Sequence, residues 1–196
     1  MAGIRQFDED KTLDVALGVF WQKGLGATSM QDLAQATGVQ RGSLYNAYQS
    51  KECLFLRVFD GYKAKMLGDM GASLNHPSID VALRNFLAFS ISSMTQGSPT
   101  RGCLSTKTAV DEHNADLDTV RSALQGFLNE MEGLLTARFE AEEARSKLAI
   151  APVDAARVIV TFTRGIVVLE RIYQDVERLR KNADLIVQLL LPSRAN

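Results

Sequence analysis

Apolar residues recur every three or four positions over long stretches of this chain that contain no proline, and this spacing restricts what the chain can fold into. Its four prolines stand at positions 77, 99, 152 and 192. Between them the apolar residues follow the period of an α-helix, and the period-two alternation typical of a β-strand is nearly absent. We therefore expect an all-α protein with the prolines at the breaks between helices.

The pattern predicts about nine helices. Three short ones would form an N-terminal helix-turn-helix head, residues 1–50, and the others a helical body for ligand binding and dimerisation, residues 51–196. The expected helices cover about residues 8–23, 29–37, 40–47, 50–74, 83–94, 103–113, 117–135, 152–173 and 179–190.

The composition excludes several classes of protein. Of the 196 residues 46% are hydrophobic, and 22 Lys and Arg nearly balance 23 Asp and Glu, which excludes a disordered chain. No apolar run approaches the about 20 residues of a membrane span, and residues 1–14 contain no apolar segment of a secretory signal. Two cysteines and two histidines predict neither a disulfide scaffold nor a zinc site. We expect a soluble, cytoplasmic protein without a metal, a cofactor or a membrane partner.

A helix-turn-helix pattern lies within residues 28–54. Two short helical segments flank Gly38, which can adopt the positive φ that a tight turn needs. Ala34 is small where the two helices must cross closely, and Val39 and Leu44 would fill the small core between them. In such a motif the second helix enters the major groove of DNA.

The outward residues of that second helix have the chemistry for DNA recognition. Arg41 can pair with guanine and Asn46 with adenine, while Gly42 lets the helix lie close to base edges. Neighbouring hydroxyls and a lysine can bind phosphates, which position the protein without reading sequence. The candidate DNA-binding residues are Thr28, Ser29, Arg41, Gly42, Ser43, Tyr45, Asn46, Tyr48 and Lys51.

Over residues 8–60 the chain resembles the TetR family of transcriptional repressors. The resemblance rests on four strings in register: A-L-G-V-F-W-Q-K-G, T-S-M-Q-D-L-A, G-V-Q-R-G-S-L-Y and S-K-E-C-L. It implies a homodimer with one recognition helix per subunit and a variable ligand domain. Gln40 stands where the family often has Ser or Thr, and Asn46-Ala47 replaces a bulkier pair, which leaves the operator sequence open. A three-helix head that binds protein instead of DNA is the alternative.

Aromatic and polar side chains in the body are candidates for an effector pocket, because ligand pockets are largely apolar with a few polar groups. Each of them could equally fill the core. The candidates are Phe86, Phe89, Ser90, Ser93, Cys103, Thr106, His113, Phe127, Met131 and Phe162.

Cys103 supports an alternative mechanism, a repressor that senses oxidants or electrophiles through a thiol. The cysteine is expected at a helix N-terminus near Arg101 and Lys107, where the dipole and the cations would lower its pKa. The string G-C-L-x-x-K also looks like a subset of the TetR family with this cysteine. A small buried side chain that packs a helix start is the structural alternative. Cys53 is expected to be buried beside Leu54.

The last two helices are more apolar than one buried face requires, so we expect them to form a four-helix dimer interface with a two-fold mate. The charged residues of this region, Glu170 among them, would form its rim. The expected partners are therefore an operator duplex, a small-molecule effector and a second subunit. A helical-bundle enzyme is disfavoured, because the metal-, phosphate- and nucleophile-binding motifs are absent. An interaction module without an effector is the third possibility.

Overall fold

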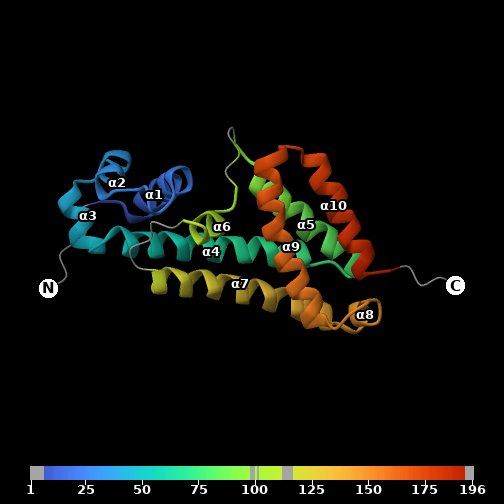
Figure 1. Cartoon of the computed structure of the whole chain (residues 1–196). Helices are drawn as coiled ribbons and strands as arrows, with labels where there is room; N and C mark the ends of the chain where they lie inside the picture. The colour runs from blue at the N-terminus through green and yellow to red at the C-terminus, as the bar shows by residue number, and fades with distance from the viewer. Residues whose placement is uncertain (1–6, 98–99, 101, 112–116, 193–196) are drawn as a thin grey trace. The chain divides into compact units, whose positions relative to one another are not determined.

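The computed structural model describes residues 7–97, 100, 102–111 and 117–192, and across these ranges the chain has ten α-helices and no strand (Figure 1). The all-α prediction is confirmed. The helices are α1 (Glu9–Lys23), α2 (Met30–Thr37), α3 (Arg41–Tyr48), α4 (Lys51–Leu74), α5 (Ile79–Thr95), α6 (Leu104–Ala109), α7 (Leu117–Glu140), α8 (Glu142–Arg145), α9 (Pro152–Tyr173) and α10 (Val176–Leu190).

Two features of the helices differ from the prediction. Helix α8 has four residues, too few to produce a periodic apolar pattern, and the sequence did not indicate it. Helix α6 spans six residues, Leu104–Ala109, where a longer segment over 103–113 was expected. Among the described helices, none combines the length and the apolar character that a bilayer crossing needs.

The chain divides into two compact units. The first contains the chain up to Ala64 together with Leu104–Leu124, and the second contains Lys65–Cys103 and the chain from Gln125 onward. Helix α6 thus belongs to the same unit as the N-terminal helices. The predicted boundary at residue 50, between a DNA-binding head and a body for ligand binding and dimerisation, is a division by function and stays a prediction.

In the first unit, α1, α2 and α3 surround a small aromatic core that also includes the first half of α4. Phe20 of α1 lies edge-on against Phe55 of α4, with ring centres 5.3 Å apart, and Phe55 stacks on Phe59 at 5.7 Å. All three rings are fully buried. Aromatic rings bury a large apolar area, and this cluster therefore supplies much of the stability that three short helices lack by themselves.

In the second unit, α5, α9 and α10 lie side by side (Figure 1). Pro152 opens α9 at its first turn, where a missing N–H costs nothing. The apolar face of α7 is also buried in this unit and contributes Phe127, Met131 and Phe139. These contacts form the core of the body.

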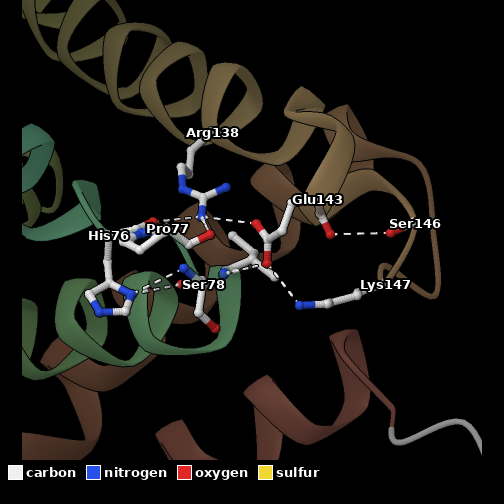
Figure 2. Close-up of polar contacts among 8 residues, drawn as sticks. His76, Pro77, Ser78, Arg138, Glu143, Ser146 and Lys147 are labelled. Carbon is white, nitrogen blue, oxygen red and sulfur yellow. Dashed lines mark hydrogen bonds and ion pairs between the residues drawn. The ribbon is translucent and has the colours of Figure 1, made fainter.

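A polar cluster in the second unit holds the turn between α4 and α5 (Figure 2). Arg138 Nη2 donates to the carbonyl oxygen of His76 at 2.8 Å and to Glu143 Oε2 at 3.2 Å. Glu143 Oε1 in turn accepts from the backbone N–H of Ile79, the first residue of α5, at 3.0 Å, and from Lys147 Nζ at 2.9 Å. A carboxylate distant in sequence therefore satisfies an orphan donor at the start of α5.

Candidate nucleic-acid interface

The start of α2 is closed by a capping box. Ser29 Oγ accepts from the Asp32 N–H at 3.1 Å, and Asp32 Oδ2 accepts from the Ser29 N–H at 2.9 Å. A hydrogen bond from Lys23, helped by the bonds from Ser29, holds the pKa of Asp32 well below its usual range. At the other end Gly38 takes the left-handed conformation, with φ of 70°, and ends the helix as predicted.

Helix α3 presents a polar outward face. Arg41, Gly42, Tyr45 and Asn46 are exposed and Ser43 is half-buried, whereas Leu44 is fully buried. The Arg41 guanidinium lies 5.4 Å from the centre of the Tyr45 ring, which holds the long side chain over its own helix. A Cβ built on Gly42 meets no other group of the protein, so packing does not require a glycine there.

Three of the nine residues predicted to bind DNA make contacts within the protein, and their role in DNA binding stays a prediction. Thr28 is buried and its hydroxyl donates to the Gly24 carbonyl at 2.6 Å, and Tyr48 is buried as well. Lys51 Nζ donates to the carbonyl oxygens of residues 25, 26 and 28 at 2.9, 3.1 and 3.0 Å. Thr28 and Lys51 thus hold the turn between α1 and α2, because carbonyls left open in a tight turn need donors.

A hollow of about 480 Å³ lies beside α3, between the starts of α2 and α4. The N–H groups at a helix start create a positive potential that suits a phosphate, and the hollow borders two such starts. One carboxylate, that of Glu52, also lines it. The lining residues are Gly26, Ala27, Thr28, Ser29, Met30, Tyr45, Ser50, Lys51 and Glu52.

The candidate effector residues are divided in the structure. Phe86, Ser90, Cys103, Phe127 and Met131 are buried, Phe89, Ser93, Thr106 and Phe162 are half-buried, and His113 lies outside the described residues.

The hydroxyls of two polar candidates are hydrogen-bonded to the backbone of their own helix. The hydroxyls of Ser90 and Ser93 donate to α5 carbonyls at 2.8 Å each. Thr106 belongs to the first unit, whereas the other described candidates belong to the second.

Cys103 lies at the start of α6, where it was expected, and it is buried, as in the structural alternative. It is 7% exposed, directly before α6, and its Sγ accepts a hydrogen bond from Arg164 Nη1 at 3.4 Å. Arg101 lies outside the described residues, and Lys107 binds carbonyls of α1. Cys53, expected to be buried, is exposed. Arg164 is 61 residues away in sequence, so spacing could not reveal this contact.

Glu170 was expected on a charged rim and is 2% exposed. Its Oε1 accepts from the Thr100 hydroxyl at 2.7 Å. Its position in α9 could have indicated this burial. Glu170 follows Thr163, Ile166 and Val167 at helical spacing, and all three belong to the buried face of the helix.

The model for the tetR family of bacterial regulatory proteins matches residues 13–58. Among curated proteins, the chain is 36% identical over 99 residues to the HTH-type transcriptional repressor ComR of Escherichia coli K12. The aligned residues cover 50% of this chain and 47%, about half, of ComR. It is 25% identical over 195 residues to the uncharacterised HTH-type regulator YezE of Bacillus subtilis 168, with 95% of this chain and 97% of YezE covered.

Two solved structures share the fold over nearly the whole chain. One is a cysteine-substituted form of the TetR family regulator CifR in complex with a 26-base-pair operator duplex, with a TM-score of 0.84, 25% identity, and 96% of this chain and 99% of that chain covered. The other is the reduced form of Escherichia coli NemR, with a TM-score of 0.82, 18% identity, and 95% and 98% covered. The second likeness concerns the fold alone.

Proposed function

Since this chain belongs to the TetR family of transcriptional regulators, we propose that it is a repressor that binds a palindromic operator as a homodimer and is released by a small-molecule effector. Its place of action would be the cytoplasm. We propose no enzymatic activity for it.

The outward face of α3 is the observation that carries the proposal. An exposed guanidinium and an exposed amide, Arg41 and Asn46, stand on one short helix whose opposite side is buried. Arginine recognises the guanine edge and asparagine the adenine edge in the major groove. The hollow between the starts of α2 and α4 offers a place for a backbone phosphate. The operator complex of CifR supports a duplex as the partner.

The homodimer is supported by apolar side chains that α9 and α10 leave open. Val168 and Ile172 of α9 and Leu185 and Leu189 of α10 are all exposed. An apolar patch of this kind is a usual sign of a protein–protein interface. Two-fold pairing would supply two recognition helices, which a palindromic operator requires.

The effector class stays open, and a thiol-based mechanism through Cys103 is the alternative. The hydrogen bond from Arg164 places a cation beside the sulfur, which favours that alternative, while burial of the side chain disfavours it. An effector would act by binding the DNA-incompetent state more tightly than the competent one.

Binding to the DNA upstream of its own gene tests the proposal. We expect the purified wild-type protein to retard that fragment. We expect Arg41→Ala and Asn46→Ala to weaken binding by about tenfold or more, because each removes a base contact. Arg57→Ala is the control, since Arg57 is an exposed arginine of the same unit that pairs with Glu9 and lies outside α3.

Equal affinity of the wild type, Arg41→Ala and Asn46→Ala would show that α3 does not read the operator. A wild type that retards no fragment of its upstream DNA would contradict the regulator proposal itself.

A further inference from the structure

Helix α6 and the two residues after it contact the head through polar side chains. The segment Leu104–Asp111, called the α6 segment below, follows α4 and α5 in the chain, yet it groups with the N-terminal helices. Its polar contacts reach the last turn of α1 and the turn that joins α1 to α2, residues 24–28.

Lys107 binds the end of α1. Its Nζ donates to the carbonyl oxygens of Trp21 and Gln22 at 2.8 and 2.7 Å. These carbonyls lie in the last turn of α1, where the helix has no N–H left to offer them. A cation at this position also interacts favourably with the negative end of the helix dipole.

Asp111 binds the turn itself. Its Oδ2 accepts from the backbone N–H of Gly26 at 2.7 Å. The approach is so close that a Cβ on Gly24 would lie 3.3 Å from Asp111 Oδ2 and 3.6 Å from Lys107 Cε, and Gly24 has a φ of +85°. The backbone conformation favours glycine here, and the α6 segment packs directly against it.

The turn leads directly into the recognition motif. Ser29, the N-cap of α2, follows it in the chain, and α2 packs on both α1 and α3. Lys51 binds the carbonyl oxygens of residues 25, 26 and 28. The α6 segment binds the carbonyl oxygens of residues 21 and 22 and the N–H of residue 26. Two separate parts of the chain thus determine how α2 leaves α1.

We propose that Lys107 and Asp111 are positioning residues for DNA binding, which hold the α1–α2 turn so that α3 is presented in the orientation that the operator needs. This inference rests on the proposed function and extends it. It adds to the DNA-binding machinery a segment that lies more than fifty residues after the helix-turn-helix motif and need not touch DNA.

The charge of Asp111 allows a sharp test. Removal of a carboxylate makes the head more positive, and for DNA this change alone strengthens binding. A positioning role predicts the opposite result, because the Gly26 N–H loses its acceptor and the turn relaxes. Asp60→Ala is the matched control, since it removes an exposed carboxylate from the same unit.

The experiment compares operator affinity in full-length wild type, Asp111→Ala, Lys107→Met, Lys107→Arg and Asp60→Ala. We expect Asp111→Ala and Lys107→Met to bind about tenfold more weakly than wild type. Lys107→Arg, which keeps a donor for the two carbonyls, should recover most of the affinity, and Asp60→Ala should bind as well as wild type or slightly better. Hydrogen exchange measured by mass spectrometry should be faster over residues 20–30 in the two weak binders only.

Wild-type affinity in both Asp111→Ala and Lys107→Met would overturn the inference while the proposed function stands. So would a loss of binding that is accompanied by loss of the helical circular dichroism signal at the assay temperature, because the residues would then act on folding alone. Absence of wild-type binding would remove the proposed function and the positioning role together.

Discussion

At the scale of single residues, cations that look equivalent in the sequence have different roles. Arg41 is exposed on α3, whereas Lys51 and Lys107 donate to backbone carbonyls around one turn, and Arg164 donates to a buried sulfur. A lysine can bury its apolar stem and direct its charge to a carbonyl, so its presence near a DNA-binding motif does not by itself indicate a phosphate contact.

The two cysteines should differ in reactivity because of their exposure. In the folded protein we expect iodoacetamide to label Cys53, which is exposed, well before Cys103, which is buried. Mass spectrometry of tryptic peptides over a time course measures both rates, and labelling in denaturant provides the reference in which the two rates converge. Faster labelling of Cys103 than of Cys53 in the native protein would instead favour the thiol-sensor alternative.

At the scale of secondary-structure elements, helix ends in this protein are satisfied by side chains from distant parts of the chain. The last turn of α1 receives Lys107, and the first N–H of α5 receives Glu143. Burial by itself would raise the pKa of Glu143, but the hydrogen bonds from Ile79, Lys147 and Arg138 outweigh it and lower the pKa below its ordinary value of 4.5. The folded state therefore binds a proton at Glu143 less readily than the unfolded state does.

This difference predicts an acid-dependent stability of the body. The contribution of Glu143 is fully present above its unfolded pKa of 4.5 and is lost as the pH falls below that value. We expect Glu143→Gln to lower the Tm at pH 7 and to narrow the difference in Tm between pH 7 and pH 3.5. Circular dichroism melts of wild type, Glu143→Gln and the control Glu140→Gln, an exposed carboxylate of α7, would measure it. A variant that loses as much Tm on acidification as the wild type would contradict this role.

At the scale of the whole molecule, we expect the apolar side chains left open on α9 and α10 to form the interface of the proposed homodimer. Leu185 is 56% exposed and Leu189 is 70% exposed, both on α10. Large apolar side chains that recur on one helix are costly to leave in water, and pairing with a second subunit would bury them.

Charge on this patch should abolish the dimer. We expect the double variant Leu185→Asp and Leu189→Asp to elute as a monomer of 21.5 kDa in size exclusion with light scattering, whereas the wild type elutes at twice that mass. It should also lose operator binding, since one recognition helix covers a single half-site. Ile150→Asp, which places a charge on an exposed apolar residue before α9, is the control and should remain a dimer. A monomeric wild type would exclude the interface.

The sequence by itself determined the helical class, the helix-turn-helix motif and most helix positions. The reason is local: helix periodicity, N-caps such as Ser29 and turn glycines such as Gly38 act over a few residues, and the structure follows them. The outward face of α3 was predictable for the same reason, because the helical period alone decides which of its residues share a face.

Only the tertiary structure decided what the polar residues contact. Thr28 and Lys51 turned inward, Glu170 became buried, Cys103 met Arg164, and the α6 segment joined the head. Each of these outcomes depends on a partner between 4 and 86 residues away in the chain. Most lie well beyond the few residues over which helix periodicity and capping act, and an unsatisfied carbonyl or N–H accepts whichever donor or acceptor the fold brings to it.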